Sequence, residues 1–132
     1  MKTFTEILQW INADRTPSTG EGVIVAVCDS GISENHSSLV GKVIEHIDIT
    51  GDGIRDAFGH GTSVASLIAN VAPNVKFLDI KVLGNNGNGD FSNLMRGVEI
   101  AISKGAHIIN MSMAGGQDCL QDGTVARFMD TI

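Results

Sequence analysis

The sequence predicts an α/β domain, a three-layer αβα arrangement around a mainly parallel sheet of about four strands. Short β-branched runs alternate along the chain with segments of helical periodicity. The clearest run, residues 22–28, is apolar at consecutive positions, which is typical of a central strand covered on both faces. Glycine and proline turns separate the segments, so each strand is expected to lead into a crossover connection.

Each expected element follows from its local pattern. Residues 1–21 are expected to form a lead-in helix (5–13) and a loop, and residues 22–132 the α/β core. The expected strands are 22–28, 42–47, 75–82 and 106–112. The expected helices of the core are 59–70, 91–104 and a segment that begins at Thr124. Pro73 ends the first of these helices and Gly105 follows the second.

Composition excludes several classes of protein. The 132 residues are 42% hydrophobic and 18% charged, which argues against disorder. A net charge of −6 argues against a nucleic-acid partner, which would require clustered Lys and Arg. The first eight residues include an acid and no long apolar stretch, so we expect neither a secretory signal nor a membrane partner. Cys28 and Cys119 do not make a disulfide framework, which favours a reducing, cytoplasmic setting.

Two polar residues are expected at one edge of the sheet. Asp29 ends the buried strand, and His60, flanked by glycines, opens a helix in which Thr62 and Ser63 are expected caps. Sites in parallel sheets form outside the carboxyl ends of the strands. A carboxylate beside a histidine can fix the imidazole tautomer and stabilise the imidazolium. The proton donor to such a base would be a serine or cysteine nucleophile.

Three motifs occur in order along the chain: Val-Ala-Val-Cys-Asp-Ser-Gly at 25–31, Gly-His-Gly-Thr-Ser-Val-Ala at 59–65 and Ile-Asn-Met-Ser at 109–112. They resemble motifs of the subtilisin-like serine protease (subtilase) family, and the similarity runs from about residue 22 to about residue 115. The resemblance implies a serine endopeptidase fold in which Asp29 is the triad acid and His60 the general base.

The resemblance also implies where a peptide or protein substrate would bind. Gly87, Asn88 and Gly89 would pair with an extended peptide as an added strand. The pocket for the residue before the scissile bond would be lined by Ser112, Met113, Ala114 and Gly115. No cofactor is implied. Residues 48–53 are similar to the first half of a calcium loop, but Gly59 stands at the twelfth position, where such loops carry a glutamate, so a polar loop is favoured.

The sequence departs from the family where the nucleophile is expected. The family carries its serine in a downstream Gly-Thr-Ser-x-Ala segment, which these residues do not include, and its oxyanion-hole asparagine is missing too. Ser63 stands where the family has a second histidine, and Ala114 replaces a preferred glycine. Cys28 points to the opposite face from Asp29, and Ser30 lies beside the acid, so neither replaces the serine. We therefore expect an N-terminal portion that is inactive alone and needs a C-terminal portion or self-association.

Two other interpretations stay open. A truncated or degenerate module of the same fold would bind a peptide or partner without catalysis. A nucleotide-binding domain would use the glycine-rich loop 84–89, but its spacing is not that of the dinucleotide fingerprint and Asp90 would repel phosphate. The remaining histidines show no metal-ligand spacing and are expected to be surface or core residues: His36, His46 and His107.

Overall fold

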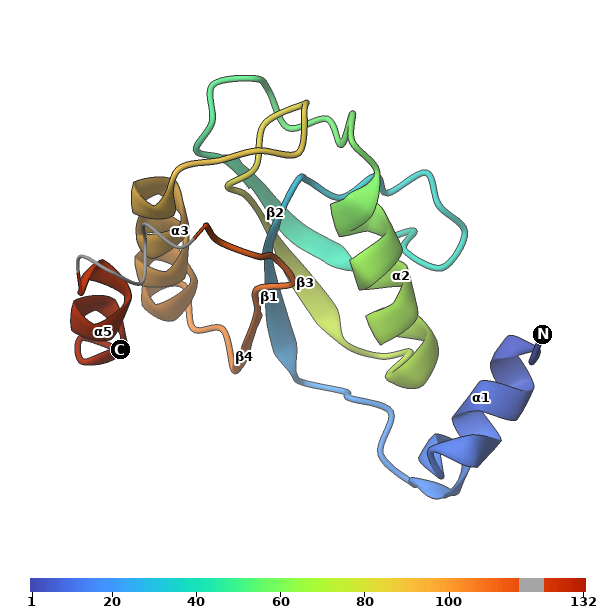
Figure 1. The fold of residues 1–132 in the computed structure, drawn as a ribbon. Helices are drawn as coiled ribbons and strands as arrows, with labels where there is room; N and C mark the ends of the chain where they lie inside the picture. Colours follow the sequence, from blue (N-terminus) through green and yellow to red (C-terminus); the bar gives the residue numbers. More distant parts are fainter. Residues whose placement is uncertain (117–122) are drawn as a thin grey trace.

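The computed structural model describes residues 1–116 and 123–132. Four parallel strands form one sheet in the order β2-β3-β1-β4 (Figure 1). The strands are β1 (Ile24–Asp29), β2 (Val43–Asp48), β3 (Lys76–Lys81) and β4 (Ile108–Asn110). This arrangement confirms the predicted α/β class. The expected strand 106–112 was too long, because the chain leaves the sheet after Asn110 to line a cavity.

Helices cover both faces of the sheet. The elements are α1 (Phe4–Trp10), the 3-10 turn η1 (Ala13–Arg15), α2 (His60–Val71), α3 (Phe91–Ser103) and α5 (Thr124–Met129). In Figure 1, α2 and α3 lie on opposite sides of the strands. Among the described residues, no helix is both long and apolar enough to cross a membrane.

The core has two halves, one on each face of the sheet. Successive side chains of a strand point to opposite faces, so the uninterrupted apolar run of β1 supplies both halves. The half under α2 includes Val25, Val27, Ala65 and Ala69. The half under α3 includes Ala26, Cys28, Ile80 and Ala101. The continuous run therefore marks the strand that both layers of helices cover.

Helix α1 depends on local interactions rather than on the core. It has no buried residue, and Trp10 is 74% exposed. A capping box joins Thr3 and Glu6 at its start, and the Lys2 ammonium lies 5.7 Å from the centre of the Trp10 ring. In Figure 1, α1 lies apart from the strands.

Three charged residues share one row at the carboxyl edge of the sheet. Asp29 of β1 is in register with Lys81 of β3, and Lys81 is in register with Asp48 of β2. Lys81 is fully buried, and its ammonium donates to the carbonyl of Arg55 at 2.6 Å and to Asn85 Oδ1 at 2.7 Å. Of these three residues only Asp29 was predicted for this edge, and it sits where parallel strands end together.

Candidate active site

The acid and the histidine predicted from sequence are in contact. Both carboxylate oxygens of Asp29 lie 2.9 Å from Nδ1 of His60. Asp29 is fully buried, whereas the His60 side chain is 43% exposed and lines a cavity. The carboxylate is an acceptor only, so this contact places a proton on Nδ1 and leaves Nε2 as the nitrogen that can take a further proton.

The first turn of α2 is held by Asp56, a loop residue that no sequence motif singled out. Asp56 Oδ1 accepts hydrogen bonds from the Gly59 amide at 2.7 Å and the Ser30 hydroxyl at 2.8 Å. Its Oδ2 accepts from the amide and the hydroxyl of Thr62. Burial alone would raise the pKa of Asp56, but these hydrogen bonds lower it below its usual 3.8. The available signal was an acid three residues before the glycine that opens the helix.

The capping prediction for Thr62 and Ser63 was wrong. The helix begins after Gly59, which has a left-handed conformation (φ 92°) and no side chain to offer. Residues outside the helix accept hydrogen bonds from its free amides instead. Ser30 Oγ accepts from the Gly61 amide at 2.9 Å, and Asp56 accepts from the Thr62 amide. The helix start is therefore fixed by segments that follow β1 and β2.

Gly61 is required by a close approach of two backbones. A Cβ at this position would lie 2.2 Å from the Gly31 carbonyl oxygen and 3.2 Å from the Asp29 Cβ. At Gly59 a Cβ would meet nothing within 4 Å, so that glycine is required by its positive φ instead. The contact between Gly61 and Gly31 brings His60 down onto Asp29.

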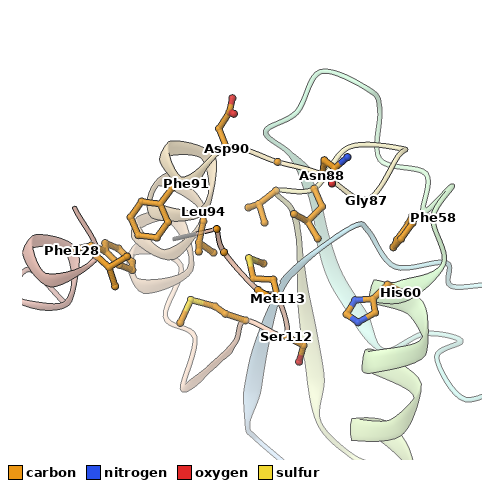
Figure 2. Close-up of a pocket in the computed structure, with 18 of the residues that line it drawn as sticks. Phe58, His60, Gly87, Asn88, Asp90, Phe91, Leu94, Ser112, Met113 and Phe128 are labelled. Carbon is orange, nitrogen blue, oxygen red and sulfur yellow. The ribbon is translucent and has the colours of Figure 1, made fainter. Parts of the chain in front are cut away.

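A cavity of about 720 Å³ lies beside His60 (Figure 2). All the residues predicted to contact substrate line it: Gly87, Asn88, Gly89, Ser112, Met113, Ala114 and Gly115. The first three precede α3, and the others follow β4. The buried Asp29 lies behind His60. The structure therefore gathers the predicted site residues around one cavity, with His60 on its wall.

Much of the cavity wall is apolar, and most of that surface was not predicted. The additional lining residues include Phe58, Leu83, Phe91, Leu94 and Phe128. The rings of Phe91 and Phe128 meet edge to face with centroids 5.7 Å apart. A Cβ at Gly87 would lie 2.5 Å from the Phe58 ring, so this ring packs directly on the glycine backbone. Helical periodicity places Leu94 on the apolar face of its helix but does not reveal that this face borders a cavity.

Within the described residues, no side chain hydrogen-bonds to His60 Nε2. Cys28 is fully buried, and burial together with the charges of Asp29 and Asp79 raises its thiol pKa to about 12. The Ser30 hydroxyl is occupied by Asp56 and Gly61. Ser112 lines the cavity, but its hydroxyl accepts from Asn110 Nδ2 at 2.8 Å. The part of the chain that the structure describes thus presents an acid and a base without a paired nucleophile.

Several backbone amides of the loop 84–89 already donate hydrogen bonds within the protein. The Gly84 amide donates to the Asn88 carbonyl at 2.8 Å, and the Gly87 amide donates to the Gly84 carbonyl at 2.9 Å. The Asn85 and Asn88 amides donate to side-chain oxygens of Asp52 and Asn86. A phosphate-binding loop keeps such amides free, so this geometry argues against a nucleotide site.

The Asp48 carboxylate likewise accepts hydrogen bonds from the loop that follows it. It accepts from the amides of Thr50, Gly51 and Gly53 and from the Thr50 hydroxyl. Burial opposes the effect, but these bonds lower the pKa of Asp48 below 3.8. Among residues 1–116 and 123–132, no group of three or more His, Cys, Asp or Glu side chains is arranged to hold a metal ion.

Comparisons with known proteins identify the family of the chain. The model of the subtilase family matches residues 20–130. Alkaline elastase YaB of Bacillus sp. strain YaB is 42% identical over 104 residues, which cover 72% of this chain and 27% of the elastase. Subtilisin DY of Bacillus licheniformis is 36% identical over 119 residues, covering 80% of this chain and 43% of that protein.

A solved structure shows the same fold. The crystal structure of a cold adapted subtilisin-like serine proteinase matches with a TM-score of 0.70 and 30% identity, covering 88% of this chain and 45% of the other. The chain spans less than half the length of each of these three relatives.

Proposed function

Since this chain belongs to the subtilase family, we propose that it is part of a serine endopeptidase in which Asp29 orients His60 and His60 acts as the general base. The observation that carries this proposal is the contact of the buried Asp29 carboxylate with Nδ1 of His60, at 2.9 Å. The pair fits acyl transfer because Nε2 borders a cavity large enough for peptide side chains.

In this reaction His60 moves the proton. Its Nε2 takes the proton of a serine hydroxyl as the serine oxygen attacks the peptide carbonyl, and later gives it to the leaving amine. Asp29 stays ionised and stabilises the imidazolium formed in between. The serine and the oxyanion donor come from chain outside these 132 residues, so we propose that the 132 residues alone do not hydrolyse peptides.

The substrate is an extended peptide that lies along the cavity. The amides of Gly87 and Asn88 are engaged within the loop, so the Gly87 carbonyl and the backbone of Gly89 pair with the peptide as an added strand. Residues 112–115 form the opposite wall. The rings of Phe91 and Phe128 and the thioether of Met113 border the same space. Apolar surface of this kind favours apolar side chains in the peptide. Ala114 adds a methyl group to the wall and narrows it relative to glycine.

The outer edge of β4 is the proposed docking place for the rest of such an enzyme. β4 pairs with β1 on one side, and in the described part of the chain no strand pairs with its other side. Ile108 is 54% exposed there. An open apolar edge favours pairing with another strand. We therefore expect residues 1–132 to self-associate in sedimentation experiments, and a stable monomer would count against this expectation.

A second candidate is a peptide-binding module without catalysis. It is favoured by the lack of a hydrogen bond from a described serine to His60 Nε2. The same cavity would hold the peptide, and the Asp29–His60 pair would be a structural remnant.

A chimera separates the two candidates. Residues 1–130 are joined to the part of subtilisin DY that follows its matched stretch, and the product is treated with a serine-directed fluorophosphonate. We expect the chimera to be labelled, residues 1–132 alone to stay unlabelled, and His60→Ala in the chimera to abolish labelling. A folded chimera that stays unlabelled would favour the binding module. Labelling of residues 1–132 alone would overturn the assignment of the nucleophile to another segment.

A further inference from the structure

The structure contains a second histidine–carboxylate cluster, centred on His46. In the β2–β3 pair His46 lies opposite Asp79, and its Nδ1 is 2.7 Å from Asp79 Oδ2. Its Nε2 is 3.1 Å from Glu34 Oε2. A neutral imidazole has one N–H and one lone pair, so it can donate to only one of two carboxylates. When Asp79 and Glu34 are both ionised, only the imidazolium satisfies both contacts, unlike His60, where a single carboxylate faces one nitrogen.

The cluster holds the segment of residues 31–34, which follows the strand that carries Asp29. Asp79 Oδ2 accepts from the Ile32 amide at 3.1 Å, and Glu34 reaches His46 from the end of the same segment. Asp79 is only 1% exposed, and its Oδ1 has no hydrogen-bond partner within the described residues. A buried, ionised carboxylate with one unpaired oxygen is stable only with a cation beside it, and here that cation is the His46 imidazolium.

The same segment contacts the helix that carries His60. The Gly31 carbonyl packs on Gly61, where a Cβ would lie 2.2 Å from its oxygen. The Ser33 amide donates to Thr62 Oγ1 at 2.9 Å. Residues 31–34 therefore touch the His46 cluster on one side and the first turn of α2 on the other.

The charges around His46 come from several elements. Asp79 of β3 and Glu34 face it directly; Asp56 acts on Asp79, and β1 contributes the Cys28 thiol near Asp79. Helix α2 has no Asp, Glu, Lys or Arg, and Lys81 is engaged by Arg55 and Asn85. The neighbouring Glu45 pairs with Lys104 instead, at 2.8 Å.

These surroundings raise the pKa values of both His46 and Asp79. Burial alone would lower the pKa of His46, but the hydrogen bonds that its ring donates to Asp79 and Glu34 outweigh burial and raise the pKa above 6.5. Burial raises the pKa of Asp79 to about 6, against the opposing effect of His46. The His46 ring thus keeps its second proton to higher pH than an ordinary histidine does.

We propose that His46, protonated between Asp79 and Glu34, is a pH-sensitive clamp that positions residues 31–34 and, through them, the turn of α2 that carries His60. Loss of the His46 proton leaves two carboxylates facing a ring with one N–H, which releases the Glu34 end of the segment. Because the folded pKa of His46 is raised, its proton contributes fully below pH 6.5 and is lost as pH rises through the higher folded value. On the acid side the clamp weakens as Asp79, whose pKa is raised to about 6, takes up a proton. This proposal concerns conformation and does not depend on peptide hydrolysis.

The test is a pH titration of the 132-residue chain by NMR, following the histidine rings and the backbone amides. We expect His46 to titrate above 6.5, and the Ile32, Ser33 and Glu34 amides to shift with the same midpoint. A second inflection at that midpoint is expected in the His60 ring signals. A His46 midpoint at or below 6.5, or amides of 32–34 that ignore it, would overturn the proposal.

Two single-charge variants sharpen this test. Glu34→Gln removes the partly exposed carboxylate of the cluster and should lower the His46 midpoint while the chain stays folded. Glu45→Gln removes the same charge from the adjacent residue of β2, which pairs with Lys104, and should leave the midpoint unchanged. Equal effects of the two substitutions would show a general charge effect and contradict the clamp.

Discussion

Both carboxylate oxygens of Asp29 lie 2.9 Å from Nδ1 of His60, although one residue ends β1 and the other begins α2. The turn after β1 makes this contact possible. Ser30 accepts from the Gly61 amide, and the Gly31 carbonyl packs on the bare Cα of Gly61. The dyad is therefore held by this backbone packing and by the Ser30 amide, which donates to Asp29 Oδ1 at 2.7 Å.

Asp56→Asn should destabilise the chain because the carboxylate accepts from Gly59 and Thr62 at the start of α2 and from Ser30 after β1. We expect a loss of about 1–3 kcal/mol in the free energy of unfolding at pH 7, measured by urea denaturation. The folded pKa of Asp56 is lowered, so its contribution is present above pH 3.8 and is lost as pH falls through the lower folded value. The gap between wild type and variant should therefore narrow in acid.

The matched control for Asp56 is the exposed Asp14→Asn. This substitution should change the free energy of unfolding by less than about 0.5 kcal/mol at pH 7. If the difference in unfolding free energy between wild type and Asp56→Asn stayed constant down to pH 2, the role of the ionised carboxylate would be contradicted.

Gly61→Ala should be strongly destabilising, although alanine normally favours a helix. Its methyl group would enter the Gly31 carbonyl, and we expect a cost of at least about 2 kcal/mol by urea denaturation. At Gly116 a Cβ would meet nothing within 4 Å, so Gly116→Ala serves as the control with little change. A neutral or stabilising Gly61→Ala would show that helix and turn are not in close contact.

Cys28 should be inert in the folded chain. A rise in thiol pKa from 9.0 to about 12 lowers the thiolate fraction near neutral pH by about 1,000-fold, and the sulfur is fully buried. In a Cys119→Ser background, a disulfide reagent such as DTNB should react with Cys28 only once urea unfolds the chain. Rapid reaction under native conditions would reopen Cys28 as a nucleophile.

The parts of the structure that were predicted correctly have local signals. The uninterrupted apolar run of β1 indicated a strand buried on both faces, and the periodicity of α2 and α3 indicated their apolar faces. Topology then placed Asp29 and His60 at the same edge, because parallel strands end together. Their direct contact needed only this placement and the glycine at position 61.

The parts that were missed depend on side-chain contacts that have no local sequence pattern. Asp56 caps a helix from outside it, and His46 meets Asp79 only because β2 and β3 pair in one register. The shortness of β4 has no local pattern either, since the chain after Asn110 leaves the sheet for the cavity. The partners of Asp56 lie 3, 6 and 26 positions away and Asp79 lies 33 positions from His46, and no sequence pattern pairs these residues.

The protonation state of the His60 ring tests the central claim most directly. Two-bond ¹H–¹⁵N NMR correlations distinguish Nδ1–H from Nε2–H in the neutral imidazole of the 132-residue chain. A base oriented by Asp29 requires the proton on Nδ1 and a free lone pair on Nε2. We predict the Nδ1–H tautomer, and its loss in Asp29→Ala. A neutral His60 with its proton on Nε2 would contradict the assignment of Asp29 and His60 as orienting acid and general base.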